Sequence, residues 1–587
     1  MPRHRSRSPH WPWLLLVALL WPAHGMAQDA RAIQVVIEGV EGALRDTLRN
    51  DLSLSHLEND RYPAQTEFLF RRGKQELSNS LRAHGYYQAQ VTSSLERDAN
   101  TALARFHIQT GEPVYIREVS IQIQGSGANE LAWQRYRQFE LPLREGQRLF
   151  HADYLKTITD LLNIATNHGY LDARYLQRRF EVSPERGEAS IDIVLDTGDP
   201  YLFGPLSFDE HSQIEQALLH RFVEFSQGDR FSNAALAELQ QTLISTRYFG
   251  MVRYDPRFDE REGREIPISV YLEDNLPHRY RVGLGAGTDT GPRLLLGFEN
   301  RLVNERGHRY EFDSVLGQSA QSGLFNYSIP GRLPARQRWN LRAGMESSQS
   351  DFLRRTRTTL MPEYSHLTRN NWLLGPYLSL EQETYQYEGQ QQFTSQLLVS
   401  GITLQKRVLN ATAYPTSGYR HNLALRMTRR ELLSDSEFLQ LEAATKWVTS
   451  PLEGWRLIAR GKLATTLSDD LEEIPASYRY LLGGETLRGF TFESVGVRGE
   501  QGGLTGAKHM ALASVETDYR FGRWLGLAAF TDAGQVFESG VNTSLKVGSG
   551  IGLRAFTPVG QIRLDMAWAV SEPNNPWRLH FSLGLDL

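Results

Sequence analysis

The second half of the chain, from about His278 to Leu587, alternates apolar and polar residues with a period of two. In the last segment, apolar residues occupy the odd positions from Trp577 to Leu587, and polar or small residues occupy the even positions from Arg578 to Asp586. The segments from Gln561 to Val570 and from Tyr419 to Thr428 repeat this pattern. Because a period of two places successive side chains on opposite faces of a β-strand, this half of the chain predicts a long series of strands.

The length of this region decides between two kinds of β-structure. A soluble sandwich also alternates, but its apolar faces must meet each other, and such domains rarely need ~310 residues in one sheet system. A membrane barrel places its apolar faces against lipid and its charged faces towards a wet lumen. At ~20 residues for each strand and its turn, the region holds about sixteen strands. We therefore expect a transmembrane antiparallel β-barrel over residues 277–587.

The N-terminus has the layout of a secretory signal. Three arginines among the first seven residues precede an apolar run from Trp11 to Leu20, and Gly25-Met26-Ala27 follows it. The run is roughly half the ~20 residues that a spanning helix needs, and a small-x-small pattern marks a cleavage site. Residues 1–27 are therefore expected to be a signal peptide that is cleaved near Ala27.

Composition and short motifs argue against an enzyme. The 64 basic and 68 acidic residues give a net charge of −4, so no general nucleic-acid surface is expected. The chain has no cysteine, and its 16 histidines show no metal-ligand spacing. Asp196 and Asp289 each begin an Asp-Thr-Gly triplet, but nothing in the layout brings the two carboxylates together as an aspartic protease requires. We expect no catalytic, cofactor or metal site.

The first half of the chain contains a pattern that occurs three times. Each copy has an opening strand, helical segments, a tight turn with aromatic residues, and two alternating strands. The turns span 84–89 (His-Gly-Tyr-Tyr-Gln-Ala), 168–173 (His-Gly-Tyr-Leu-Asp-Ala) and, in diverged form, 247–252. The period is about 80 residues, which predicts three small α+β domains. Their expected ranges are 28–113, 114–200 and 201–276.

These units resemble polypeptide-transport-associated (POTRA) domains, which have the same order of elements and a glycine-aromatic turn after the second helix. The resemblance covers roughly residues 30–276. Independently of it, a small α+β domain with an exposed sheet edge can accept an extended strand from a client or partner. The alternative is that the domains act only as spacers.

Three further motifs lie in the last third of the chain. They are a loop at 482–490 (Leu-Gly-Gly-Glu-Thr-Leu-Arg-Gly-Phe), a strand at 530–537 that contains Phe-x-Asp-x-Gly, and a glycine-rich stretch from Gly550 to Asp565. Together they resemble the outer-membrane insertase superfamily, which includes BamA, the two-partner secretion transporters and TamA. BamA carries five POTRA domains and two-partner transporters carry two. Three POTRA-like units therefore place the chain closest to TamA, a subunit of the translocation and assembly module.

The resemblance implies that the loop folds back into the barrel and that its arginine contacts an acidic residue of the inner wall. The loop motif consists of Leu487, Arg488, Gly489 and Phe490. Arg488 matches the family's arginine, Asp532 matches the acidic partner, and Glu516 is a second candidate. A guanidinium that keeps its proton needs carboxylate partners in a confined lumen. The alternative is that this pair only braces the lumen. Leu587 departs from the aromatic terminal residue that is frequent in the family.

Glycines predict a weak point between the first and last strands of the barrel. In the first strand, the residues from Tyr280 to Ala286 at even positions face lipid, while Gly283, Gly285 and Gly287 leave the inner face without side chains. Gly584 lies on the last strand. Because glycine weakens a strand, we expect a lateral seam there. The alternative is a closed seam whose glycines relieve crowding in the lumen.

The resemblance also implies the function. It implies an outer-membrane protein with periplasmic POTRA-like domains that inserts or translocates clients such as autotransporters. It further implies a large periplasmic partner anchored in the inner membrane, as TamB is. Two alternatives remain open, namely a two-partner secretion transporter for one dedicated exoprotein and a passive porin.

Overall fold

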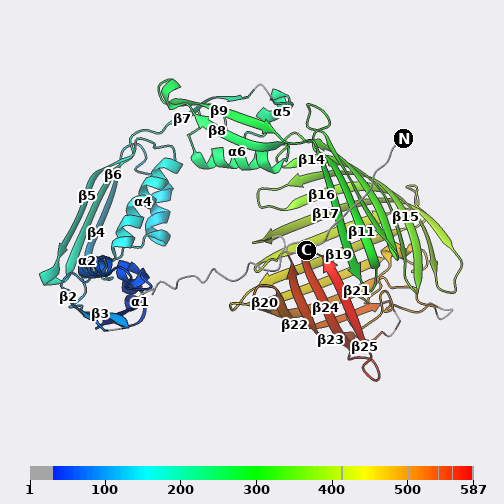
Figure 1. The fold of residues 1–587 in the computed structure, drawn as a ribbon. Coiled ribbons are helices and arrows are strands. Elements are labelled where there is room, and N and C mark those ends of the chain that lie inside the picture. The colour runs from blue at the N-terminus through cyan, green and yellow to red at the C-terminus, as the bar shows by residue number, and fades with distance from the viewer. Residues whose placement is uncertain are drawn as a thin grey trace, which may run out of the picture. The chain divides into compact units, whose positions relative to one another are not determined.

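The computed structural model describes residues 31–98, 100–209, 212–411, 414–499, 503–539, 541, 543–557 and 560–584 (Figure 1). The expected signal peptide and Leu587 lie outside these ranges. Three small three-stranded sheets are followed by a closed barrel of sixteen antiparallel strands, which confirms the predicted fold class. Among the described residues, no helix is both long and apolar enough to cross a membrane.

The chain divides into two compact units. The first consists of residues 1–203 with 228–233 and 262–266, and it contains the first two sheets. The second consists of residues 204–227, 234–261 and 267–587, and it contains most of the third sheet together with the barrel.

The first domain packs two helices on one face of its sheet. Its elements are β1 (Ala32–Glu38), α1 (Gly42–Asp51), η1 (Ser53–His56), α2 (Pro63–Ala83), β2 (Gln90–Arg97) and β3 (Thr101–Gln109). The strand order is β1-β3-β2, with β1 parallel to β3 and β2 antiparallel to it. The alternation of β3 buries Ala104, Phe106 and Ile108 against Leu77 and Leu81 of α2. A continuous apolar core therefore forms within about 80 residues.

The second domain repeats this arrangement. Its elements are β4 (Tyr115–Gln124), α3 (Leu131–Arg135), η2 (Tyr136–Glu140), α4 (His151–Asn167), β5 (Arg174–Ser183), η3 (Pro184–Arg186) and β6 (Glu188–Asp196). The strand order is β4-β6-β5. Ile191, Ile193 and Leu195 on the central strand are buried against Leu161 and Ala165 of α4.

The third domain has the strand order β7-β9-β8 and contacts the barrel. Its elements are β7 (Leu202–Phe208), α5 (Gln216–His220), α6 (Asn233–Ser245), β8 (Phe249–Pro256), η4 (Phe258–Glu260) and β9 (Glu265–Asp274). The Tyr248 hydroxyl donates to the Gly307 carbonyl at 2.5 Å, and Arg336 donates to both oxygens of Glu224 at 2.9 and 3.1 Å. The turns of the barrel next to this domain are thereby held to it.

The glycine-aromatic turns of the first two repeats are joints between consecutive domains. Gly85 has φ +87°, and its carbonyl accepts the Val114 amide at 2.9 Å. A Cβ on Gly85 would lie 2.6 Å from the Leu149 carbonyl oxygen. Gly169 repeats this geometry, with φ +85° and an acceptor contact to the Tyr201 amide at 2.8 Å. Glycine is required at both joints because the conformation and the close approach exclude a side chain.

Sixteen strands form the barrel, and each pairs antiparallel with its neighbours along the chain. They are β10 (His278–Gly287), β11 (Gly291–Asn300), β12 (Arg309–Gly317), β13 (Ala320–Pro330), β14 (Gln337–Gln349), β15 (Leu353–Leu367), β16 (Leu373–Tyr387), β17 (Phe393–Leu409), β18 (Gly418–Thr428), β19 (Phe438–Thr449), β20 (Trp455–Leu467), β21 (His509–Phe521), β22 (Leu525–Phe537), β23 (Lys546–Thr557), β24 (Gly560–Ala569) and β25 (Trp577–Gly584).

The alternation seen in the sequence separates the outer wall from the lumen. On β25, Trp577 and Leu579 are exposed on the outside, whereas His580 and Ser582 are buried. The connection from β20 to β21 is long, and its described residues, 468–499 and 503–508, include several that pack against the inner wall. Its Leu482 and Leu487 pack with Val536 of β22. The lumen therefore contains a loop that belongs to the chain itself.

Candidate functional site

The segment 482–490, which we call the lumen loop, makes a tight reversal inside the barrel. The Gly484 amide donates to the Phe490 carbonyl at 3.0 Å, which closes the reversal. Leu487 is fully buried, and Phe490 is buried beside it. Gly489 has φ +97°, and a Cβ there would lie 3.0 Å from the Ala569 main-chain nitrogen. The loop therefore approaches the backbone of β24 where only glycine fits.

Arg488 points into the wall and is 4% exposed. Its guanidinium binds Asp532 with two bonds, Nε to Oδ2 at 2.8 Å and Nη2 to Oδ1 at 2.9 Å. Its Nη1 donates to Glu516 at 2.8 Å and to Asp565 at 3.1 Å. The structure thus brings together the predicted arginine and both predicted acids, and it adds Asp565. A fork of five N–H donors suits this multiple contact, which a lysine could not reproduce.

Two further arginines complete the network. Arg554 Nη2 donates to Glu516 at 2.7 Å, and its Nη1 binds Asp565. Arg460 Nη2 donates to Glu516 at 3.1 Å. Three guanidinium groups therefore face three carboxylates, and their charges balance in a buried place. Arg554 and Asp565 belong to the glycine-rich stretch from Gly550 to Asp565, but their sequence pattern predicts no partner for either residue.

Alternate glycines on β23 make the space for this network. A Cβ on Gly548 would lie 1.8 Å from the Arg488 carbonyl oxygen, and one on Gly552 would lie 1.9 Å from Asp565 Oδ1. Gly550 faces the ring of Phe530, over which the Arg488 guanidinium stacks at 3.3 Å from the ring centroid. Glycine at every second position of a strand was the sequence signal for a deep contact on its inner face.

The strands that close the barrel are joined over a short distance. Within the described residues, β10 and β25 share one paired position, Gly287 with Ser582. The Thr288 amide adds one bond to the Phe581 carbonyl at 3.1 Å. By comparison, β25 pairs with β24 along its whole length. Gly584 pairs with Gln561 of β24, and no partner for it on β10 is seen in this part of the chain.

The predicted seam glycines do not all leave empty space. A Cβ on Gly285 would lie 2.8 Å from Nε of Arg293, so this arginine of β11 fills the inner face there. Gly283 faces Leu295 at 3.6 Å, an ordinary contact distance. The glycines of β10 themselves carry no side chains, as expected. The space beside Gly285 is nevertheless filled, because Arg293 of the neighbouring strand β11 lies there. At Gly285 this geometry also suits the alternative of relieved crowding.

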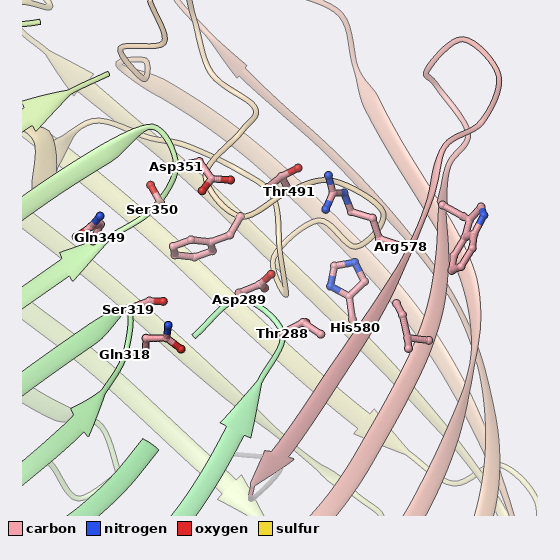
Figure 2. A pocket seen from close by; sticks show the side chains of 13 residues that line it. Thr288, Asp289, Gln318, Ser319, Gln349, Ser350, Asp351, Thr491, Arg578 and His580 are labelled. Atoms are coloured by element: carbon pink, nitrogen blue, oxygen red, sulfur yellow. The ribbon is translucent and has the colours of Figure 1, made fainter. Parts of the chain in front are cut away.

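A polar cavity of about 800 Å³ lies beside the closing strands. It is lined by Thr288, Asp289, Gln318, Ser319, Gln349, Ser350, Asp351, Thr491, Phe492, Trp577, Arg578, Leu579 and His580. Figure 2 shows Asp289 and His580 among these lining residues, the former from the turn after β10 and the latter from β25. Asp289 Oδ2 and His580 Nδ1 are buried and have no hydrogen-bond partner among the described atoms.

A second buried ion pair lies in the lumen, and the sequence analysis did not find it. Arg456 of β20 binds Asp518 of β21 through Nε at 3.0 Å and Nη2 at 2.5 Å. Tyr414, from the turn between β17 and β18, donates to Asp518 at 3.2 Å and lies under the Arg456 guanidinium at 4.0 Å. Two separate ion networks therefore hold connecting loops against the inner wall. Within the described ranges, no three potential metal ligands gather.

Two family models match the chain. The Omp85 superfamily domain matches residues 304–587. A POTRA domain model, TamA domain 1, matches residues 34–110.

Individual proteins are also similar to this chain. The outer membrane protein assembly factor BamA of Buchnera aphidicola is 22% identical over 183 residues, which are 28% of this chain and 30% of that protein. The chain thus spans less than a third of this curated relative. BamA of Haemophilus ducreyi without POTRA domains 1–3 has a similar fold, with a TM-score of 0.55 at 14% identity, covering 95% of this chain and 99% of that one. CdiB of Acinetobacter baumannii gives a TM-score of 0.49 at 13% identity, covering 90% and 100%.

Proposed function

Since this chain belongs to the Omp85 superfamily of outer-membrane assembly and translocation factors, we propose that it inserts or secretes clients such as autotransporters through its barrel seam, as the TamA subunit of a translocation and assembly module. Its barrel is an outer-membrane barrel with POTRA domains ahead of it, and proteins of this superfamily are not enzymes.

The single observation that supports the seam is the short pairing between β10 and β25. Beyond the Gly287–Ser582 pair, the described residues Leu583 and Gly584 of β25 have no paired residue on β10. Tyr280, Val282 and Leu284 are 75–78% exposed, more than the large apolar residues of the other barrel strands. Unpaired backbone amides in hydrocarbon cost several kcal/mol each, so this edge favours pairing with another strand.

A client strand could satisfy that edge by β-augmentation. An extended segment of the client would hydrogen-bond to β10 and present its apolar side chains to lipid. The client's amides would then never cross the hydrocarbon unpaired. The binding free energy would come from strand pairing and apolar burial, so no nucleotide is needed.

The lumen loop would hold the strands of the barrel wall in place while a client strand pairs with β10. Arg488 joins β21, β22 and β24 through their carboxylates, so displacement of the loop would leave buried acids without their partner. We further propose that the POTRA domains bind a TamB-like partner anchored in the inner membrane. The TamA-type first domain supports this assignment.

A two-partner secretion transporter and a passive porin are less well supported. The former has two POTRA domains, whereas this chain has three such sheets. A porin needs an open lumen, whereas here the lumen loop and its ion network lie inside the lumen against the inner wall.

Reconstitution tests the proposal. The purified protein in liposomes should speed the insertion of an unfolded autotransporter barrel by about tenfold over empty liposomes, because the seam lowers the barrier to strand insertion. The measurement is the protease-protected fraction of client with time. Liposomes that conduct ions but insert the client no faster than empty ones would identify a porin.

A further inference from the structure

We infer that the lumen loop is a clasp that holds both strands of the seam to the barrel wall, and that His580 is the positioning residue by which it holds β25. This inference rests on the proposed seam and identifies what regulates its opening. Three groups of contacts carry it, on the wall, on β25 and on the turn that follows β10.

On the wall, Arg488, the residue before Gly489, is bound to Asp532 through both its side chain and its main chain. The Arg488 side chain is bound to Asp532, and the Arg488 main-chain amide also donates to Asp532 Oδ2 at 3.1 Å. Gly489 itself lies against the backbone of Trp568 and Ala569. The position and direction of the Gly489 amide are therefore set by β22 and β24, strands that lie within the continuous part of the wall.

On β25, that amide has a single acceptor. The Gly489 N–H donates to His580 Nε2 at 3.0 Å, and His580 is 6% exposed. Because Nε2 accepts, the imidazole is neutral and carries its proton on Nδ1. Without His580, the Gly489 amide would be buried and unpaired, which is costly. The bond therefore links the last strand to the ion network of the wall.

On the other side of the seam, the same loop approaches the turn after β10. A Cβ on Gly484 would lie 2.3 Å from Asp289 Oδ2, so only glycine permits this approach. The Asp289 carboxylate also interacts with the main-chain amide of Glu485. Asp289 and His580 line the same cavity (Figure 2). One loop thus contacts both strands that meet at the seam.

The sparse pairing of the seam makes these contacts important. Within the described residues, the direct bonds across the seam are those of the Gly287–Ser582 pair, the Thr288 amide bond to the Phe581 carbonyl and the Phe581 amide bond to the Thr288 hydroxyl at 3.4 Å. The loop contacts are therefore a large share of the described contacts that hold the two strands together. Loss of one hydrogen bond should therefore raise the open population measurably, whereas the same loss between two long strands would not.

Hydrogen–deuterium exchange of the full chain in lipid nanodiscs tests this clasp. The Thr288 amide donates across the seam, so its exchange reports opening. His580→Ala should speed exchange of the peptide that contains Thr288 by about fivefold, the effect of one typical hydrogen bond. His580→Gln should restore slow exchange, because its side-chain oxygen replaces Nε2 as an acceptor. Asp289→Ala should also speed exchange of this peptide, because it removes the contact between the loop and the turn after β10.

Arg578→Ala is the matched control. Arg578 lies on the same face of β25, two residues from His580, and no hydrogen bond or ion pair from it to the lumen loop is found among the described residues. In this variant, the peptide that contains Thr288 should exchange as slowly as in the wild type. Wild-type exchange in both His580→Ala and Asp289→Ala would overturn the clasp, as would a His580→Gln variant that exchanges as fast as His580→Ala.

Client insertion by the same variants separates the clasp from the proposed function. Faster seam exchange with unchanged client insertion would support the clasp and contradict the seam as the client route. Unchanged exchange would contradict the clasp even if a covalently locked seam stopped client insertion.

Discussion

Individual side chains of the lumen show why a buried ion network depends on every member. Glu516, Asp532 and Asp565 are almost fully buried and share the guanidinium groups of Arg488, Arg554 and Arg460. Desolvation of these groups offsets much of their attraction, so the network adds little net stability. Removal of one cation, however, leaves a carboxylate uncompensated in a place that water reaches poorly. We therefore expect the network to fix the position of the loop more than it stabilises the barrel.

Arg488→Ala should reduce client assembly strongly while the barrel stays in the membrane. Breaking a buried ion pair costs about 3–5 kcal/mol, which is enough to release the loop, but the lipid-facing side chains are unchanged. Arg488→Lys should assemble clients at an intermediate level, because lysine keeps the charge and loses the two-bond contact to Asp532. The measurement is client level in outer membranes at matched amounts of each variant.

Arg479→Ala provides the control for this variant. Arg479 is on the same long connection and is also buried, but it binds the carbonyls of Ile474 and Glu472 rather than the acids of the wall. It should affect folding of the connection without the specific loss of the loop anchor. Normal client assembly by Arg488→Ala at normal protein level would show that Arg488 only braces the lumen.

Part of this network could be predicted from sequence and part could not. Arg488 and Asp532 stand in recognisable motifs, and the period of two places Asp532 on the inner face. Asp565 and His580, which bind Arg488 and Gly489 of the loop, lie opposite each other on β24 and β25. Their place beside the loop is therefore set by strand register. Register follows from turn geometry and packing across strands, so alternation alone could not identify that contact. Arg456 with Asp518 was missed for the same reason.

The domains and their joints follow from local signals to a greater extent. Each of the first two sheets has its own buried core, and each of the first two glycine-aromatic turns accepts an amide of the next domain. The repeat revealed the turns, but their role as joints required the structure, because the contacts join residues about 30 positions apart.

Deletion of residues 30–112 should abolish docking of the TamB-like partner before it harms the barrel. The first domain has a separate core and belongs to the unit that does not contain the barrel, so its loss removes a surface and no barrel contact. The measurement is co-purification of the partner from envelopes, with the heat-dependent gel mobility of the barrel as the folding control. Partner recovery equal to that of the full chain would contradict this assignment.

At the scale of the whole molecule, the described residues form a continuous wall that closes between β10 and β25 over a short register. Fifteen successive strand pairs run from β10 to β25 along the chain, whereas the closing pair has a single register position among the described residues. A barrel otherwise removes every sheet edge, so a short closure is the place where an edge can reappear. The wall binds the lumen loop through Arg488, and in the proposed clasp the same loop binds the closing strand β25 through His580.

The most direct measurement locks this closure. The chain has no cysteine, so Gly287→Cys with Ser582→Cys can form a disulfide at the seam position that is paired in the described part of the chain. The matched control is Arg563→Cys with Ser582→Cys, a pair between β24 and β25 that stays together in an open or closed seam. If clients pass through the seam, the oxidised seam pair should assemble them about tenfold more slowly, because β10 can no longer offer its edge, and reduction should restore the rate. The control should assemble clients normally in both states. A locked seam that assembles clients at the wild-type rate, with no change on reduction, would contradict the lateral route.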